Sequence, residues 1–154
     1  MTTYHLAQIN IARMRYPLDD PRMAGFTNRL DEINALADDA EGFVWRLQTN
    51  EGNATDIQVF DDQWIIVNMS VWKSIEALRH YTFKTAHVEL LRNRKAWFEH
   101  MDSPAVAMWW VSEGYLPTPA EAKEKLALIE QIGASADSFT FAKPFAPDGK
   151  PIGK

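Results

Sequence analysis

Cysteine is absent from the 154-residue chain, which excludes disulfides, thiolate metal ligands and a cysteine nucleophile. No apolar run approaches the roughly 20 residues of a membrane-spanning helix. The basic excess typical of nucleic-acid-binding proteins is also missing, because 16 Lys and Arg stand against 21 Asp and Glu, a formal net charge of −5. With an N-terminus that lacks the pattern of a secretory signal, these absences predict a soluble cytoplasmic protein without a nucleic-acid or membrane partner.

The common catalytic motifs are missing as well. The chain has no Gly-x-Gly-x-x-Gly run or P-loop for nucleotide phosphates and no Gly-x-Ser-x-Gly elbow for a hydrolase. It has no His-x-x-x-His or Glu-x-x-His run, so no metal held by protein ligands is predicted. What the chain has in quantity is aromatic residues, namely six Trp, eight Phe and four Tyr. Such rings predict a thick core with an oligomer contact, and an aromatic-lined ligand pocket is the alternative.

The first half of the chain alternates between strand and helix patterns. Residues 4–11 predict a strand with His5, Ala7, Ile9 and Ile11 on one side. Residues 23–37 predict one helix, because its apolar residues step by three and four. Residues 43–49 and 64–71 predict two further strands, the second of them apolar on both sides and therefore central in its sheet.

The second half predicts a long helix, a strand and a final helix. Residues 71–101 have a helical pattern with a kink at 81–85, and either Ser70 or Ser74 is the N-cap. Residues 105–111 predict a strand, and Thr118 caps a helix over 119–132 that ends at Gly133. A single domain over 1–146 and a loose tail over 147–154 are expected.

This order of elements is typical of the ferredoxin-like split βαβ fold, an α+β class. It predicts a four-stranded antiparallel sheet with two helices on one face, plus a C-terminal helix. A strand that is apolar on both sides cannot leave one side in water. A second copy of the sheet is the simplest cover, which predicts a homodimer through the sheet faces.

Several aromatic landmarks are similar to a known family. They are Phe43-Val44-Trp45-Arg46, the segment 87–98 with Trp97-Phe98, Trp109-Trp110-Val111 leading through Gly114 to Pro117, and Phe139-Thr140-Phe141. In these the chain resembles the DUF3291 family over nearly its whole length. The resemblance implies a dimeric α/β barrel. The broader group of dimeric α/β barrels to which this family is assigned resembles antibiotic-biosynthesis monooxygenases, haem-degrading enzymes and stress-response barrel proteins.

One helical face of the long predicted helix carries the main candidate site. Phe83, His87, Leu90, Arg94 and Trp97 follow one another at intervals of four, three, four and three. His87 is the candidate general base or axial haem ligand, and Arg94 is the candidate clamp for a carboxylate or enolate. The alternative gives His87 a backbone carbonyl as its partner and Arg94 an ion pair. Further candidates for lining the pocket are Phe83, Trp97, Trp45 and Trp109.

Polar residues on the predicted strands form a second set. Arg46 lies either at the rim of the sheet or facing a pocket. Tyr4, Gln8 and Asn10 share one side of the first strand and line a cavity with Asn68, or else bond across the dimer.

Two functions follow from these candidates. The first is a small-molecule monooxygenase-like enzyme with an aromatic cavity beside His87, which uses either no cofactor or haem. The second is a non-enzymatic ligand-binding or stress-related dimeric barrel protein.

Overall fold

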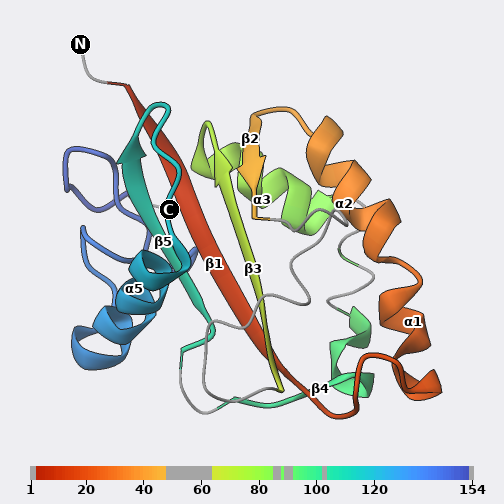
Figure 1. Cartoon of the computed structure of the whole chain (residues 1–154). Coiled ribbons are helices and arrows are strands. Elements are labelled where there is room, and N and C mark those ends of the chain that lie inside the picture. The colour runs from red at the N-terminus through yellow and green to blue at the C-terminus, as the bar shows by residue number, and fades with distance from the viewer. Residues whose placement is uncertain (1–2, 48–63, 85–87, 89–91, 102–103, 153–154) are drawn as a thin grey trace.

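The computed structural model describes residues 3–47, 64–84, 88, 92–101 and 104–152, and the statements below concern these residues. They form an α+β protein whose five strands make one antiparallel sheet (Figure 1). The strands are β1 (Tyr4–Met14), β2 (Phe43–Arg46), β3 (Ile65–Trp72), β4 (Phe98–Glu99) and β5 (Val106–Ser112). The sheet order is β2-β3-β1, with β4 and β5 both on the far edge of β1, and the sheet is open rather than closed into a barrel.

The long strand β1 is the centre of the sheet. It pairs with β3 from Leu6 to Arg13 and with β5 from Tyr4 to Asn10, and its last two residues pair with β4. The strand therefore extends beyond the predicted range of 4–11. Its last residues pair with β3 and β4, and no local sequence pattern shows such distant partners. The predicted alternation is confirmed, since Ala7, Ile9 and Ile11 lie in one buried cluster while Leu6 lies in another.

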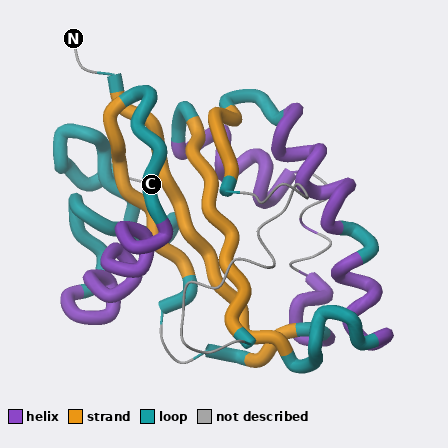
Figure 2. The backbone as a smooth tube through the Cα atoms, in the orientation of Figure 1, coloured by secondary structure: helices purple, strands orange, loops and turns teal. Residues whose placement is uncertain are grey.

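Helices cover both faces of the sheet. On the face called here the helical face, α2 (Leu30–Asp39) and α3 (Ile75–Lys84) bury Ile33, Leu78 and Tyr81 against Leu6 and Trp72. On the opposite face, α5 (Pro119–Ile132) packs Leu126 and Ile129 on Trp109 and Val111. Figure 2 places α5 on the β5 side of the sheet and α2 on the β2 side. Two helices on one face and a C-terminal helix are thus present as expected.

The helix predicted over residues 23–37 is broken. It consists of the 3-10 helix η1 (Pro21–Met23), α1 (Ala24–Thr27) and α2. Residues of poor helix propensity, Thr27 and Asn28, lie at the break. The break lets Phe26 pack on Trp97 at one end of the helical face while Ile33 packs on Trp72 at the other.

The long helix predicted over residues 71–101 is wrong at both ends. Val71 and Trp72 continue β3, because they pair with Ala7 and Leu6 of β1. The N-cap of α3 is Ser74, whose hydroxyl accepts from the Ala77 amide at 3.1 Å. At the other end of the predicted helix lie the 3-10 helix η2 (Arg94–Ala96) and β4. Arg94 and Trp97 therefore do not lie on one face of an α-helix, as their spacing predicts.

The premise of the predicted dimer is also wrong in part. Val67 and Met69, on the face opposite α2 and α3, are 5% and 0% exposed in a single chain. They therefore need no second copy to leave water. The homodimer itself stays a prediction.

The C-terminal residues line the edge of β5. Phe139 exchanges two backbone hydrogen bonds with Met108, of 2.8 and 2.9 Å. The indole nitrogen of Trp110 donates to the Phe145 carbonyl at 2.8 Å. Residues 144–152, in which the expected tail begins, close on themselves through the bond from the Ile152 amide to the Pro144 carbonyl.

Candidate functional site

Four polar side chains form a connected network on the helical face, called here the amide–hydroxyl ladder: Gln8 and Asn10 of β1, Asn68 and Ser70 of β3. The Gln8 side-chain nitrogen donates to Asn68 Oδ1 and to Ser70 Oγ, each at 2.8 Å. The Asn10 side-chain nitrogen donates to Gln8 Oε1 and Asn68 Oδ1, each at 3.1 Å. The ladder thus joins the two central strands through their side chains as well as their backbones.

The register of the two strands makes the ladder. Gln8 lies opposite Ser70, and Asn10 lies opposite Asn68. Residues two apart on a strand point to the same face, so all four side chains share the face of Leu6 and Trp72. The expected placement of Gln8 and Asn10 on one face with Asn68 is therefore confirmed within one chain, and the expected cavity stays a prediction.

Apolar clusters flank the ladder on both sides along the strands. Leu6 and Trp72 belong to the cluster under α2 and α3. Beyond the ladder, Met14 and Ile66 belong to a second cluster with Phe26 and Trp97. A polar row between two apolar clusters costs burial energy unless every group is bonded, so such a row is a candidate for ligand recognition.

The ladder runs from buried to exposed. Gln8 and Ser70 are 4% and 6% exposed, whereas Asn10 and Asn68 are exposed to solvent. A small molecule that approaches the helical face therefore meets the two asparagines first and the hydroxyl of Ser70 further in.

Ser70 is arranged as a hydrogen-bond donor. Its oxygen accepts from Gln8 and, at 2.7 Å, from the indole nitrogen of Trp72, which uses both lone pairs. Its own proton meets no acceptor among the described residues. Without available lone pairs or an adjacent base, this hydroxyl is poorly suited to act as a nucleophile.

Asn68 offers a second donor. Its side-chain oxygen accepts two bonds, from Gln8 and Asn10, which orients the amide. Its side-chain nitrogen meets no acceptor among the described residues and lies at the exposed end of the ladder. Because Gln8 holds Asn68 and Ser70 through one nitrogen atom, one small ligand can reach both.

A β-bulge brings Arg46 to the same face. The register of β2 shifts between Phe43 and Trp45, so that Arg46 lies opposite Ser70. Without the bulge, strand alternation would turn Arg46 to the α5 face. Phe43 and Trp45, which strict alternation would place on one face, pack in clusters on opposite faces for the same reason.

Arg46 is paired with α2. Its Nε donates to Asp38 Oδ1 at 2.8 Å, and its Nη2 donates to Asp38 Oδ2 at 3.3 Å. The Arg46 side chain is 11% exposed, whereas that of Asp38 is 46% exposed. The structure thus places Arg46 between the ladder and a helix rather than at an open rim.

Tyr81 of α3 completes the polar surroundings. Its hydroxyl donates to the Ile33 carbonyl at 3.2 Å, and its ring lies 5.1 Å from that of Trp72. Burial raises the pKa of the phenol well above its usual value; the charge of Asp38 adds to the rise and that of Arg46 opposes it. Tyr81 is therefore a protonated donor at neutral pH.

The candidates on the long predicted helix lie in separate places. Phe83, at the end of α3, is exposed and contacts the ring of Phe141 at 5.7 Å. Arg94 is exposed on η2, and Trp97 is buried on Phe26. His87 lies outside the described residues.

The two aromatic candidates on strands belong to the α5 face. Trp45 and Trp109 pack in the cluster beneath α5. The indole nitrogen of Trp109 donates to Glu121 of α5 at 2.8 Å. Neither residue shares the helical face with the ladder, so the structure groups these two with each other and Arg46 with the ladder.

The sequence reasoning missed three participants: Ser70, Asp38 and Tyr81. The sequence pattern predicts Ser70 as one of two possible helix caps, whereas the alternation of Asn68, Ser70 and Trp72 places it on the face of Gln8. Asp38 lies on the exposed side of its helix, and no strand pattern could pair it with Arg46 across a bulge.

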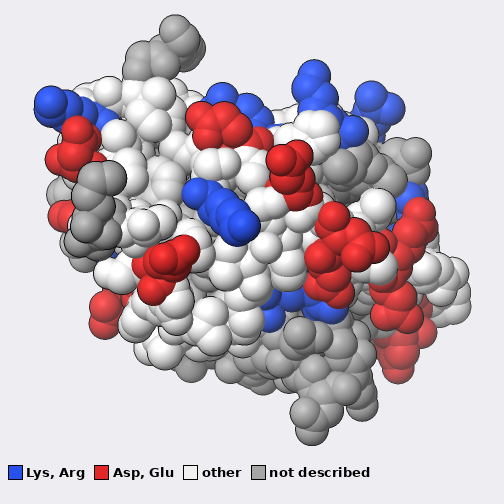
Figure 3. All heavy atoms as spheres, turned by 90° about the horizontal axis from the view of Figure 1, so that it is seen from above, with Lys and Arg blue, Asp and Glu red and all other residues white. Residues whose placement is uncertain are grey.

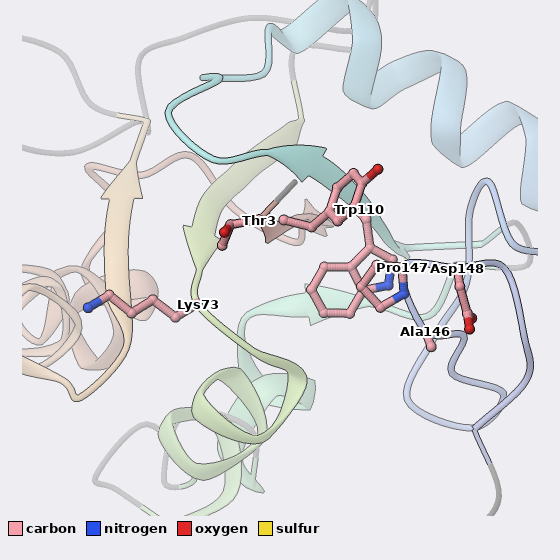
Figure 4. Close-up of a pocket in the computed structure, with 7 residues that line it drawn as sticks. Thr3, Lys73, Trp110, Ala146, Pro147 and Asp148 are labelled. Carbon is pink, nitrogen blue, oxygen red and sulfur yellow. The ribbon is translucent and has the colours of Figure 1, made fainter. Parts of the chain in front are cut away.

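A depression of about 650 Å³ lies away from the ladder, next to the start of β1 and the end of β3 (Figure 4). Tyr4, Lys73 and Trp110 line it, together with residues 146–148. The indole nitrogen of Trp110 is already bonded to Phe145, and the ammonium group of Lys73 points away from Trp110. This depression lacks the converging polar groups that the ladder has.

Metal and nucleic-acid sites find no support in the described part of the chain. Its histidines and acids form no group of three or more that could hold a metal ion. On the face drawn in Figure 3, basic and acidic side chains alternate without a continuous basic stripe. No described helix is both long and apolar enough to cross a membrane.

The fold and the ladder together define an α+β protein with a polar site on the helix-covered face of an antiparallel sheet. The family model called domain of unknown function, DUF3291, matches residues 5–153. The chain belongs to this family.

Two solved structures show a distant similarity to this chain. One is the crystal structure of PA3566 from Pseudomonas aeruginosa, with 14% identity over 75% of this chain and 99% of the other, at a TM-score of 0.47. The other is NE2512, a protein of unknown function from Nitrosomonas europaea, with 12% identity over 76% and 96%, at a TM-score of 0.44. At these scores neither supports an inference of function. No curated protein matches the chain.

Proposed function

We propose that this protein binds a small molecule through an acceptor oxygen at the amide–hydroxyl ladder. The observation that carries the proposal is the hydroxyl of Ser70, which is buried, accepts two hydrogen bonds and has its own proton left to donate. A buried donor without an acceptor costs free energy, and a ligand oxygen would remove that cost.

Asn68 supports the same ligand chemistry. Its side-chain nitrogen is a second donor, and its amide is already oriented by Gln8 and Asn10. Two fixed donors favour a carbonyl, carboxyl or enol oxygen over a donor group such as an amine. The apolar clusters on either side of the ladder supply hydrophobic contacts for the rest of the molecule.

A monooxygenase-like reaction is the second candidate. Donors aimed at one oxygen stabilise an enolate as its charge develops, and an enolate is the form of substrate that can react with molecular oxygen without a cofactor. In this candidate His87 removes the proton from the substrate carbon and Arg94 holds an anionic group. Haem, the alternative cofactor, would depend on His87 as the axial ligand.

The wider architecture in this proposal is the ferredoxin-like split βαβ unit. The sheet order β2-β3-β1-β5, with α2 and α3 on one face, supports it. We propose a homodimer as well, in keeping with the resemblance to dimeric α/β barrels.

Binding can be tested with a matched pair of probes, acetophenone, whose oxygen only accepts hydrogen bonds, and 1-phenylethanol, whose hydroxyl also donates, and we expect acetophenone to bind more tightly. We expect acetophenone to shift the side-chain amide signals of Gln8 and Asn68 and the indole signal of Trp72 in ¹H–¹⁵N NMR spectra. The Asn68→Ala variant should weaken this binding about fivefold, the loss of one neutral hydrogen bond.

An exposed asparagine away from the sheet provides the control. Asn28→Ala should leave the affinity for acetophenone unchanged. Equal affinity of the wild type and the Asn68→Ala protein, or shifts confined to other residues, would overturn the ladder as the binding site. Oxygen consumption with a bound carbonyl compound, lost in His87→Ala, would select the enzyme over the binding protein.

A further inference from the structure

The ion pair between Arg46 and Asp38 is unequal in a way that points to a ligand. The guanidinium of Arg46 is held at the inner end of the ladder by its strand, and its side chain is 11% exposed. Asp38 lies in the last turn of α2, and its side chain is 46% exposed. One partner is fixed and dehydrated, while the other can turn into water at little cost.

The geometry of the pair is that of a ligand fork. Arg46 meets the two oxygens of Asp38 with two different nitrogens, Nε at 2.8 Å and Nη2 at 3.3 Å. A carboxylate is the planar group that this fork matches best. Removing Asp38 from the fork without a replacement would leave these two donors of a nearly buried guanidinium unpaired, so exchange for another carboxylate costs less than simple departure.

The ladder begins beside this fork. Arg46 and Ser70 are directly opposite each other on β2 and β3, a position in which side chains on one face lie about 5 Å apart. The hydroxyl of Ser70 and the side chain of Arg46 therefore start from neighbouring positions on the helical face.

We propose that the natural ligand of the ladder is a carboxylic acid, and that Asp38 occupies the place of its carboxylate on Arg46 until the ligand binds. The ligand carboxylate takes the fork of Arg46 and accepts from Ser70, while Asp38 turns to solvent. This inference rests on the proposed function, because it names the class of molecule that the ladder binds.

Charge decides between a carboxylate and a phosphate. Among the described residues of the site the cation is Arg46, and α2 carries Asp31, Glu32 and Asp39 besides Asp38. A doubly charged phosphate would bring twice the charge of a carboxylate close to this acidic helix, whereas a carboxylate takes the place of the Asp38 carboxylate on the guanidinium with the same charge.

The test compares benzoate with acetophenone, which has a similar shape and no charge. In the wild type we expect benzoate, and not acetophenone, to shift the Arg46 Nε–H signal in NMR spectra. The Asp38→Asn variant removes the internal competitor and should raise the affinity for benzoate about tenfold, with the affinity for acetophenone unchanged. Arg46→Lys keeps the charge but loses the fork, and should abolish the preference for benzoate.

Asp39→Asn is the matched control, because it makes the same change of charge one residue further along the same helix. Equal gains in benzoate affinity from Asp38→Asn and Asp39→Asn would mean general electrostatics and would overturn the proposal, as would an Arg46 signal that benzoate never shifts. If acetophenone binding depends on Asn68 while benzoate gains nothing from Asp38→Asn, the ladder stands as a site and only its carboxylate ligand is rejected. Thermal unfolding of each variant shows whether its fold is intact.

Discussion

The amide of Gln8 and the hydroxyl of Ser70 meet across the two central strands, with 2.8 Å between Gln8 Nε2 and Ser70 Oγ. Both side chains are almost completely buried, on a face where apolar clusters lie on either side of them. Two strands already joined by backbone hydrogen bonds need no such link for their pairing. The bond instead fixes the orientation of two polar groups, which is what a binding site requires.

Removal of the Ser70 hydroxyl should destabilise the protein. Ser70→Ala leaves the buried donors of Gln8 and Trp72 without their acceptor, so we expect the free energy of unfolding to fall by about 1–3 kcal/mol. Urea unfolding followed by circular dichroism measures the change. Ser112→Ala, at the exposed end of β5, should change the free energy of unfolding by less than about 0.5 kcal/mol. An equally small effect of Ser70→Ala would contradict the prediction, because it would mean that losing the Ser70 acceptor costs the folded protein nothing.

Gly42 joins α2 to β2 in a conformation that only glycine adopts easily. Its φ is 82°, and a Cβ atom there would lie 2.5 Å from the Cβ of Ala77 on α3. We expect Gly42→Ala to lower stability by about 2–4 kcal/mol, through backbone strain and overpacking together. The same unfolding experiment measures it.

Gly114 separates these two causes. Its φ is 88°, and a Cβ atom there would meet nothing within 4 Å. Gly114→Ala should therefore show the backbone strain alone, about 1 kcal/mol. Equal losses in the two variants would show that α3 shifts to make room and that its contact with Gly42 is not tight.

The phenol of Tyr81 should make the protein sensitive to alkaline pH. Its pKa is raised in the folded state, chiefly by burial, so the native protein keeps a proton that the unfolded chain loses above about pH 10. The stabilising contribution is full below that pH and is lost as the pH rises further. Chemical unfolding at pH 9, 10 and 11 should show a steeper fall for the wild type than for Tyr81→Phe. Tyr4→Phe, at an exposed position, should keep the wild-type slope, and an unchanged slope in Tyr81→Phe would contradict the assignment.

The association of the chain is open to a direct measurement. Sedimentation equilibrium at micromolar concentration is expected to give a homodimer. Because Val67 and Met69 are already buried in one chain, the dimer should separate without unfolding its subunits. A folded monomer over the whole accessible concentration range would reject the homodimer.

Much of the fold could be predicted from local patterns. The final helix begins and ends as expected, since Thr118 accepts from the Glu121 amide and Gly133 follows Ile132. Such caps are short-range chemistry that a sequence displays directly. The strand over 106–112 and the alternation of β1 were predictable for the same reason.

The errors arise where distant partners decide. Val71 and Trp72 have a pattern that suits a helix as well as a strand, and their pairing with β1, more than 60 residues away, selects the strand. The bulge at Val44 has no sequence signal of its own, yet it puts Phe43 and Arg46 on the same face, where strict alternation would put them on opposite faces. The candidate site shows the same division: Gln8, Asn10 and Asn68 could be grouped by alternation, whereas the pairing of Arg46 with Asp38 could not.

The position of β1 has a consequence for how the chain folds during synthesis. This strand leaves the ribosome before the other strands of the sheet, but its partner β5 lies about 100 residues later. At a translation rate of about 5–20 residues per second, β1 waits roughly 5–20 s for that partner to be made. Throughout this interval one edge of an apolar strand is open to neighbouring nascent chains. Early chaperone contact with the first fifteen residues would therefore benefit this protein more than one whose strands pair with their nearest neighbours in sequence.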